Sequence, residues 1–457
     1  MKNGHPPGWL EVELPDVADI NMGQSPPSNT YNTQKKGLPF FQGKAEFGDI
    51  YPTAVKYCSA PSKVAEPNDI LISVRAPVGP TNLCREQSCI GRGLAAIRPN
   101  SKVLDRYLFY YFRSIENWLS RQGTGSTFTA ISKSDLERLT ILLAPLPEQC
   151  RIVAMLEKLL AKVDTCQQLL ARIPTLLKRF RHSVLAAACS GRLTEDWRKK
   201  HPCNSSVVEL IEKIRQRRET EAKTAAQKEK LRQIVTNVEE NDSNELPEGW
   251  RYVTLNKLCV SFDYGTSAKS QPSGKIPVLR MGNIQDGRVD WADLVYTSDA
   301  NEIECYSLQP NTVLFNRTNS PELVGKTAIY RGERPAVFAG YLIRINQLQE
   351  LNPEYLNLCL NTNYAKEFCL RMKTDGVSQS NINAKKLGAF EVPFCPLAEQ
   401  QEIVRRVEAL FALADQIEVR CTRTKAHADN LTQSALAKAF RGELVPTETE
   451  LANSRRE

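Results

Sequence analysis

Apolar positions along the chain follow two kinds of pattern. In residues 9–145 and 250–395, short apolar runs such as Asp69-Ile70-Leu71-Ile72-Ser73-Val74 and Thr312-Val313-Leu314-Phe315 lie between turns rich in Gly, Pro, Asn and Ser. Runs of this kind are typical of strands. Helices are predicted near residues 107–119 and 354–372. Each segment is therefore predicted to be a mixed α+β domain with a twisted, largely antiparallel sheet.

After each of these segments the apolar period changes to seven residues. The seam positions, separated by alternating steps of four and three, are Ile152, Leu156, Leu159, Val163, Cys166, Leu170 and Ile173 in the first stretch, and Ile403, Val407, Leu410, Ala414, Ile417 and Cys421 in the second, where Leu431 keeps the phase. This spacing predicts coiled-coil helices. The alternative is an amphipathic helix packed on its own domain. We favour pairing because two seams with the same register can bind each other.

The chain is also an internal repeat. Pro7-Gly8-Trp9 and Pro247-Glu248-Gly249-Trp250 open the two copies, and Pro145-Leu146-Pro147-Glu148-Gln149 and Pro396-Leu397-Ala398-Glu399-Gln400 open the two heptad stretches. From there the copies match without a gap at an offset of 251 residues, as far as Gly191-Arg192-Leu193 and Gly442-Glu443-Leu444. A gapless match of this length indicates duplication of one structural unit.

Together these patterns predict an α+β protein in which two mixed α/β domains are separated by long helices that form an antiparallel coiled coil, with an internal pseudo-twofold repeat. The predicted boundaries are residues 1–147 and 246–395 for the domains, 148–245 for the first helical region and linker, and 396–457 for the second helical region. Pro174 is expected to kink the first long helix. Residues 205–235 predict a charged third helix, either a solvated spacer or a docking element, and 236–245 a flexible linker.

Composition sets broad limits on function. The 457 residues are 41% hydrophobic and 25% charged, and the net charge of +8 permits a polyanionic partner without requiring one. No apolar run is long enough to span a membrane and the start lacks a secretory signal. The 13 cysteines form no CxxC pairs and the four histidines lack zinc-ligand spacing beside them. We therefore expect reduced thiols, a cytoplasmic location and no metal site.

Signatures of catalysis are missing from the sequence. A DNA methyltransferase needs a glycine-rich cofactor loop and an Asn/Asp-Pro-Pro-aromatic pocket, but Pro6-Pro7 and Pro26-Pro27 lack these flanks. Val324-Gly325-Lys326-Thr327 resembles the end of a nucleotide-binding loop, but residue 320 is Ser instead of Gly, so we predict a strand entry here. No cluster of carboxylates suggests a nuclease. We predict a binding protein with no catalytic residues.

A possible nucleic-acid contact precedes each heptad stretch. Residues 123–133 and 375–385 combine glycines, which allow close approach of the backbone, with polar side chains and a lysine that suit phosphates and base edges. Ser132 and Asn383 would also cap the helices that begin at Lys133 and Ala384, and a helix N-terminus itself attracts phosphate. The candidate residues are Ser126, Thr127, Thr129, Lys133, Ser378, Gln379, Ser380, Asn381 and Lys385.

Further candidates follow apolar, strand-like runs. An arginine at such a position can chelate guanine or form a surface ion pair, so each residue is individually a weak prediction. These candidates are Gln42, Lys44, Arg75, Arg92, Arg280, Asn283, Asn316 and Arg317.

These motifs resemble the specificity subunit of type I restriction–modification enzymes. The resemblance rests on the "GW" starts, the "PLPEQ" and "PLAEQ" helix entries, the Gly-Ser/Thr-rich turns and the "LxxAxxGxL" ends at Leu185–Leu193 and Leu436–Leu444, and it covers essentially the whole chain. It implies two target-recognition domains that read a split site in double-stranded DNA. It also implies partners: two modification subunits with S-adenosylmethionine and two restriction subunits with ATP and Mg²⁺, while this chain holds no cofactor.

The length of the heptad stretch fits a protein that reads a split DNA site. About 25 heptad residues span about 38 Å at 1.5 Å per residue, near the 34–36 Å that separates two major grooves on one DNA face. An antiparallel pair is thus expected to act as a ruler for a site with an unread spacer. The alternatives are a scaffold that holds only proteins along a coiled coil, and an enzyme with an unrecognised methyl-donor or nucleotide site.

Overall fold

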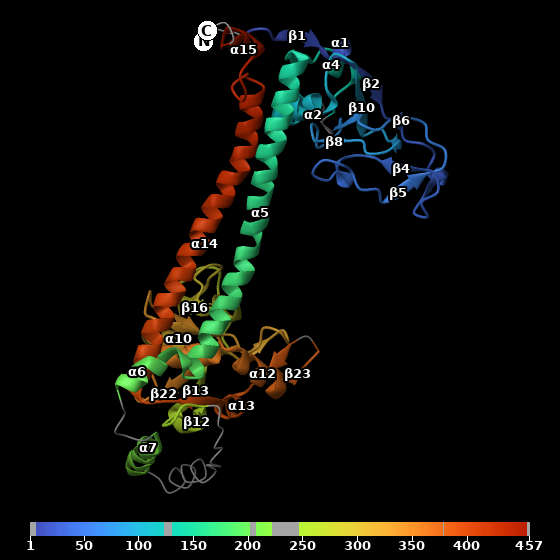
Figure 1. Ribbon diagram of the computed structural model, residues 1–457. Coiled ribbons are helices and arrows are strands. Elements are labelled where there is room, and N and C mark those ends of the chain that lie inside the picture. Colours follow the sequence, from blue (N-terminus) through green and yellow to red (C-terminus); the bar gives the residue numbers. More distant parts are fainter. Residues whose placement is uncertain (1–5, 123–129, 202–206, 222–245, 378, 455–457) are drawn as a thin grey trace. The chain divides into compact units, whose positions relative to one another are not determined.

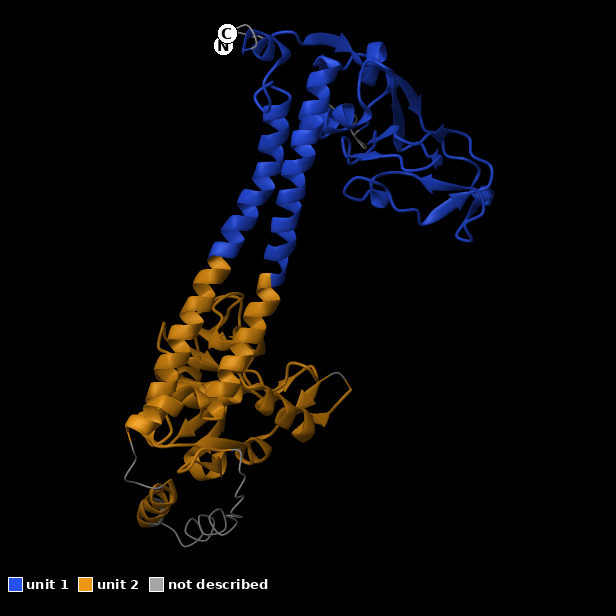
Figure 2. Ribbon diagram, viewed as in Figure 1, with its two compact units in different colours: residues 1–172, 420–457 blue, residues 173–419 orange. Residues whose placement is uncertain are grey.

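The computed structural model describes residues 6–122, 130–201, 207–221, 246–377 and 379–454 (Figure 1). The chain forms two compact units, residues 1–172 with 420–457 and residues 173–419. Figure 2 shows that each unit contains one α+β domain and part of each of the two long helices, α5 (Leu146–Cys189) and α14 (Leu397–Ala439). The second helix therefore contributes its C-terminal part to the unit that holds the first domain.

The first domain contains three sheets. Strands β2, β10, β7 and β8 form an antiparallel sheet, β3, β5, β4, β9 and β6 a second sheet, and β1 pairs with β11. The strands are β1 (Leu10–Glu13), β2 (Ala18–Met22), β3 (Tyr31–Asn32), β4 (Leu38–Phe41), β5 (Lys56–Cys58), β6 (Val64–Ala65), β7 (Ile70–Ser73), β8 (Thr81–Leu83), β9 (Ser88–Ile90), β10 (Leu94–Pro99) and β11 (Thr140–Leu143). The helices are α1 (Leu14–Val17), α2 (Asp105–Ser114), α3 (Glu116–Gln122) and α4 (Lys133–Glu137).

The second domain repeats this plan. The run β13-β22-β18-β20 has the antiparallel order of β2-β10-β7-β8, and β12 pairs with β25 as β1 pairs with β11. Its strands are β12 (Arg251–Thr254), β13 (Cys259–Tyr264), β14 (Ile276–Leu279), β15 (Ile284–Gln285), β16 (Gly287–Val289), β17 (Val295–Thr297), β18 (Thr312–Asn316), β19 (Thr318–Asn319), β20 (Thr327–Tyr330), β21 (Val337–Phe338), β22 (Leu342–Gln347), β23 (Thr374–Asp375), β24 (Ser380–Asn381) and β25 (Glu391–Phe394). Its helices are α9 (Leu255–Leu258), α10 (Ala300–Tyr306), α11 (Pro353–Leu360), α12 (Asn363–Met372) and α13 (Ala384–Gly388).

The mixed α+β prediction is confirmed in both domains. Most strand pairs are antiparallel, and the exceptions are β4–β9, β14–β21 and β16–β20. The predicted runs became β7 and β18, and Thr327 begins β20 as the strand-entry reading required. Each predicted domain helix is divided in two, at Ile115 between α2 and α3 and at residues 361–362 between α11 and α12.

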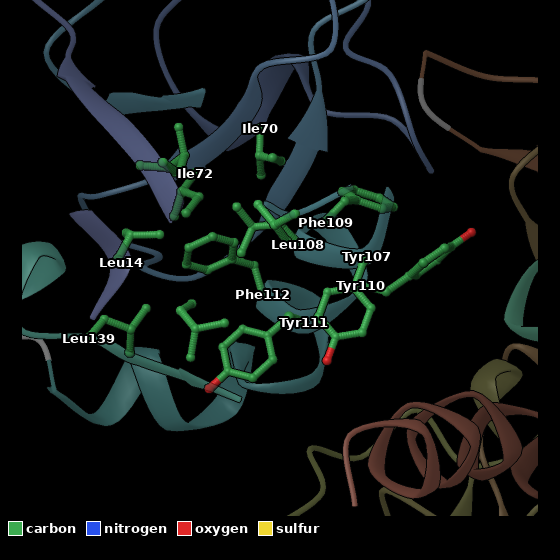
Figure 3. Close-up of a cluster of buried hydrophobic side chains, with 14 of the residues drawn as sticks. Leu14, Ile70, Ile72, Tyr107, Leu108, Phe109, Tyr110, Tyr111, Phe112 and Leu139 are labelled. Atoms are coloured by element: carbon green, nitrogen blue, oxygen red, sulfur yellow. The ribbon is translucent and has the colours of Figure 1, made fainter. Parts of the chain in front are cut away.

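The core of the first domain forms where α2 covers the sheet. Six consecutive residues of α2, from Tyr107 to Phe112, are buried. Figure 3 shows these side chains gathered with Ile70 and Ile72 of β7 and Leu14 of α1. The core also includes Ile152 and Leu156 at the start of α5 and Phe440, just past the end of α14. Both long helices are thus anchored in the domain core of this unit.

The long helices pair antiparallel within each unit. In the first unit the Gln167 amide donates to Asp429 (2.7 Å), and the Cys421 thiol donates to the Leu170 carbonyl (3.6 Å), so partners descend along α14 as residues ascend along α5. In the second unit Arg181 donates to Asp415 (2.8 Å) and to Glu418 (2.9 Å), while Arg406, earlier in α14, donates to the Leu193 carbonyl beyond the end of α5 (2.8 Å). The predicted coiled-coil pairing is therefore confirmed within the units.

The predicted seam residues differ in how deeply their side chains are buried. Ile152, Leu156, Ile403, Val407 and Ala414 are buried, while Leu159, Val163, Leu170 and Leu410 are half-buried. Ile417 and Cys166 are exposed. Leu431 lies outside the seam: its side chain is 57% exposed, and the buried neighbour is Ala428. Leu431 follows Ile403 by four heptads, and a straight α-helix drifts by about 20° per heptad from a 3.5-residue repeat.

The described chain continues α5 past Pro174 and adds three shorter helices. Pro174 lies inside α5, which continues unbroken to Cys189. Short helix α6 (Glu195–Lys200) follows, and α7 (Val207–Glu221) is the described part of the predicted third helix. The predicted linker at 236–245 lies outside the described residues. Helix α15 (Glu448–Ser454) ends the described chain.

The described residues contain neither a helix suited to a membrane nor a group of side chains suited to a metal ion. No helix there combines the length and the apolar character needed to cross a bilayer. Likewise, no three His, Cys, Asp or Glu side chains in this part of the chain come together as metal ligands.

Candidate nucleic-acid interface

Each α+β domain is held to the helices by a buried carboxylate. In the first unit, Glu148 at the start of α5 accepts hydrogen bonds from the Trp9 indole (2.8 Å) and from the backbone N–H of Glu448 (3.1 Å). In the second, Glu399 at the start of α14 accepts from the Trp250 indole (2.9 Å), and Arg198 also donates to it. The repeated "GW" and "EQ" motifs are thus two halves of one contact.

The glutamine of each motif binds backbone groups. Gln149 accepts from the Leu104 N–H (2.9 Å) and donates to the Ala144 carbonyl (2.8 Å). Gln400 accepts from the Asn352 N–H (2.8 Å) and donates to the Cys395 carbonyl (2.7 Å). Both side chains are fully buried, so these bonds satisfy polar groups that would be costly to leave unpaired. They fix each domain against the first turn of its own helix.

The glycine of each "GxL" motif completes the junction. Gly191 and Gly442 follow the ends of α5 and α14 with φ of 72° and 71°, the left-handed conformation that glycine adopts without strain. A Cβ at Gly442 would lie 2.6 Å from Pro6, and one at Gly191 would lie 2.4 Å from Pro247. Each domain start therefore packs on the end of the long helix that belongs to the other copy.

In the first domain, three loops bring candidate residues together. The Val74 N–H donates to the Gly93 carbonyl (2.9 Å), and the Ile131 N–H donates to the Val74 carbonyl (2.9 Å). The backbone at Gly91 and Gly93 lies so close to Gln42 that a Cβ at Gly93 would stand 2.1 Å from its carbonyl oxygen. The loops that carry Gln42, Arg75 and Arg92 are thus adjacent, and we call these three residues the first loop cluster.

The side chains of the first loop cluster are exposed and available to a ligand. Among the described residues, the side chains of Gln42, Arg75 and Arg92 make no hydrogen bond or ion pair, and the same holds for Lys44 next to Gln42. The Arg75 backbone bridges to Ala130, which follows the glycine-rich turn. Of the candidates in that turn, Ser126, Thr127 and Thr129 lie outside the described residues. Lys133 pairs with Glu137 one helical turn along (3.4 Å).

In the second domain, Arg317 is at the centre of an equivalent arrangement. Its N–H donates to the Tyr341 carbonyl and its carbonyl accepts from the Ile382 N–H, both at 2.9 Å, as Val74 bonds to Gly93 and Ile131. The guanidinium lies 4.7 Å from the centre of the Tyr264 ring and 3.4 Å from Asn381. We call Arg317, Tyr264 and Asn381 the second loop cluster.

The other candidates of the second domain divide into exposed and structural residues. Gln379 and Lys385 are exposed, while Ser378 lies outside the described residues. Arg280 follows β14 and lies beside the turn that carries Tyr341, because the Leu279 carbonyl accepts from the Ala339 N–H (2.9 Å). Its guanidinium, however, donates to the Asp293 carbonyl (2.8 Å). Ser380 is buried and donates to Asp375.

Asn283 and Asn316 are held inside the domain. The Asn283 side chain accepts from the Arg280 N–H (2.9 Å) and donates to the Asp290 and Ala292 carbonyls (3.0 and 2.9 Å). It closes a turn, which leaves no group free for a base. Asn316 is fully buried at the end of β18, and its amide has no hydrogen-bond partner in the described chain. These two positions do not present side chains to a ligand.

The helix caps occur as predicted. Ser132 caps α4 by accepting from the Asp135 N–H (3.3 Å), and Asn383 caps α13 by accepting from the Lys386 N–H (2.9 Å). The Ser132 hydroxyl and N–H both bond to the Asp135 carboxylate, and the hydroxyl bond is the larger cause of that group's lowered pKa. The turn before each cap is therefore fixed where it enters the helix.

Tyr264 was missed by the sequence reading. It ends β13 beside Gly265, stacks under Arg317 and accepts a hydrogen bond from the Ala384 N–H at the start of α13 (3.0 Å). An aromatic residue between an apolar run and a Gly-Thr turn was the available signal. The tyrosine links the arginine to the capped helix, so it holds the guanidinium in one orientation.

Comparisons with known proteins find one family that matches both copies of the repeat. The family described as "Type I restriction modification DNA specificity domain" matches residues 6–175 and 247–421. The EcoKI specificity subunit of Escherichia coli is 30% identical over 78% of this chain and 69% of its own length, and the EcoBI specificity subunit of Escherichia coli is 28% identical over 96% and 86%.

Two further matches are closer but shorter. A putative MjaX specificity subunit of Methanocaldococcus jannaschii is 49% identical over 33% of this chain and only 36% of its own length. The crystal structure of the HsdS subunit from Thermoanaerobacter tengcongensis is 54% identical over 34% of this chain and 38% of that chain, with a TM-score of 0.32.

Proposed function

The chain belongs to the family of type I restriction–modification DNA specificity proteins, and from this membership we propose that it reads a bipartite site in double-stranded DNA through its two loop clusters. The observation that carries the proposal is that each domain places an arginine on the loop that follows the equivalent strand of the repeat, Arg75 after β7 in the first domain and Arg317 after β18 in the second. Arginine bonds to guanine through two donors, which gives discrimination between bases. Two such surfaces on one chain suit a site with two half-sites.

The chain performs recognition and assembly, and catalysis belongs to its partners. We propose that it binds two modification subunits, which use S-adenosylmethionine, and two restriction subunits, which use ATP and Mg²⁺. We also propose that the chain itself holds no cofactor and that the complex works in the cytoplasm. Exposed apolar side chains on the long helices support docking of partners. They include Leu169 and Leu431 in the first unit, and Leu176, Phe180, Leu413 and Val419 in the second. Titration of the isolated chain with S-adenosylmethionine tests whether it lacks a cofactor site.

Exchange of residues 250–395 for the same segment of a related subunit is the test of the proposed function. We expect the methylated motif to change in one half only, because the first loop cluster stays as it was. Methylation mapping of DNA from a host with the complete system provides the measurement. A change in both halves, or in neither, contradicts independent reading by the two domains.

Arg317→Ala is expected to relax recognition at one position of the second half-site. A bidentate arginine contact contributes about 1–3 kcal/mol of discrimination between bases, so binding to the correct site should approach binding to sites changed at that position. Arg317→Lys is the matched control, because it keeps the charge and loses the planar fork. Binding of oligonucleotides with single base changes gives the readout. Equal weakening on every sequence would instead indicate a phosphate contact.

A further inference from the structure

The second unit contains a cavity of about 270 Å³ beside the C-terminal end of α5. Two cysteines meet on its wall: Cys189, the last residue of α5, and Cys359 of α11, with 3.5 Å between their sulfur atoms. Cys189 is half-buried and Cys359 is buried. The proposed DNA-reading function uses neither residue.

The first unit fills the equivalent place with aromatic rings. Cys189 corresponds to Phe440 at the constant offset of 251. Tyr355 and Tyr107 correspond because each hydroxyl donates to the carbonyl of the last domain strand, at Pro393 and Leu142. One turn further, Cys359 corresponds to Tyr111, whose ring packs edge-on against Phe440 at 5.2 Å. Two thiols thus replace two rings and leave space in front of the sulfur atoms.

We propose that Cys189 and Cys359 are an oxidisable pair, and that a small hydroperoxide entering this cavity converts them to a disulfide between α5 and α11. The cavity has room for hydrogen peroxide or a short alkyl hydroperoxide. Cys359 is 1% exposed, so an oxidant enters by way of Cys189 at the accessible wall.

The reaction proceeds in two steps. The Cys189 sulfur attacks the peroxide, the O–O bond breaks, and the products are a sulfenic acid and one water (or the alcohol). The Cys359 sulfur then attacks the sulfenic sulfur, the S–O bond breaks, and the thiol proton leaves with the hydroxide as water. The two thiols lose two electrons and the peroxide gains them.

Burial sets the order of the two residues. Burial, reinforced by the neighbouring Cys189, raises the pKa of the Cys359 thiol well above its usual range, so this thiol does not react with peroxide first, because the thiolate is the reactive form. The Cys359 thiol loses its proton only in the second step, to the hydroxide that leaves the adjacent sulfenic acid. Cys189, at the accessible wall, reacts first and Cys359 resolves it. The sulfur atoms must approach from 3.5 Å to the disulfide length of about 2.05 Å. Cys189 is the last residue of α5, so the approach requires movement only at the end of that helix.

Peptide mapping of the full chain after treatment with hydrogen peroxide tests the pairing. We expect the peptides with Cys189 and Cys359 to be linked and to lack two hydrogens, and dithiothreitol to restore both. Cys395 is the competing thiol, since it lies within electrostatic range of both Cys189 and Cys359. Cys395→Ala should keep the link and Cys189→Ala should abolish it. A Cys359–Cys395 link overturns the proposal, as does oxidation confined to the exposed Cys150, Cys166 and Cys305.

A second variant copies the packing of the first unit. Cys189→Phe combined with Cys359→Tyr fills the cavity and removes both thiols. Peroxide should raise the thermal midpoint of the unmodified protein, reversibly with dithiothreitol, because a cross-link restrains the unfolded chain. The double variant should show no such rise. An equal rise in the double variant assigns the effect to other thiols and overturns the proposal. DNA binding by the reduced protein is measured separately, so failure of the thiol pair leaves the proposed function untouched.

Discussion

Replacing Glu399 by glutamine is expected to destabilise the protein more than replacing Glu148 by glutamine. Both carboxylates are buried, and each accepts a tryptophan indole N–H and one further neutral hydrogen bond, from the Glu448 N–H to Glu148 and from the Thr194 hydroxyl to Glu399 (2.8 Å), so either amide turns an NH₂ group toward a donor. Such an unsatisfied contact costs about 1–3 kcal/mol. Glu399 also faces Arg198. Loss of that carboxylate leaves a guanidinium without its counter-charge, and breaking a buried pair costs about 3–5 kcal/mol.

Solvent reduces the expected difference in stability between the two variants, because the Arg198 side chain is 22% exposed and can be hydrated once its carboxylate partner is lost. We therefore expect the extra loss in Glu399→Gln to fall at the lower end of that range. Urea unfolding of the full chain, followed by tryptophan fluorescence, measures both variants. Arg198→Met alone and combined with Glu399→Gln completes a double-mutant cycle. Equal losses in the two single variants would show that Arg198 contributes nothing beyond the hydrogen bonds.

The repeat and the helices were predictable because their signals are local. The heptad spacing reports one helix face, and the gapless offset from Pro145 to Leu193 reports two copies of the same element. The helix caps at Ser132 and Asn383 also follow from short-range chemistry, since a side-chain oxygen two or three residues before a free N–H satisfies it. These features need no knowledge of the rest of the chain.

The end of the seam was not predictable from spacing alone. Leu431 keeps the heptad count, but the helix turns slightly less than a full heptad requires, and the deviation accumulates along α14. After four heptads Ala428 faces inward and Leu431 faces outward. Whether two helices supercoil enough to cancel this drift depends on their packing, which a single sequence does not contain.

The loop clusters could not be predicted from the local sequence either. Asn283 and Arg317 occupy similar places in the sequence, each a few residues after the end of an apolar run. The structure uses the first to close a turn with three hydrogen bonds and places the second over Tyr264. What separates them is the set of backbone groups contributed by distant loops, so residue type and local pattern gave no distinction.

The long helices also carry the last prediction, which concerns spacer length. Leu170 and Cys421 are equivalent residues of the repeat, and in the first unit they face each other across the helix pair (3.6 Å from Sγ to the carbonyl oxygen). Insertion of four residues after both positions lengthens α5 and α14 together and keeps the contacts on either side of the insertion. Each helix grows by about 6 Å at 1.5 Å per residue, which is nearly two base pairs at about 3.4 Å each.

Four residues turn the helix by slightly more than one full turn, so the seam is displaced but not turned away. We expect both half-sites to be retained and the preferred spacer to lengthen by one or two base pairs. One residue inserted at the same two positions rotates the following seam by about 100° and should abolish assembly, which makes it the matched control. Methylation mapping decides between the outcomes. An active four-residue variant with the original spacer would mean that the partner subunits, rather than these helices, set the distance between the half-sites.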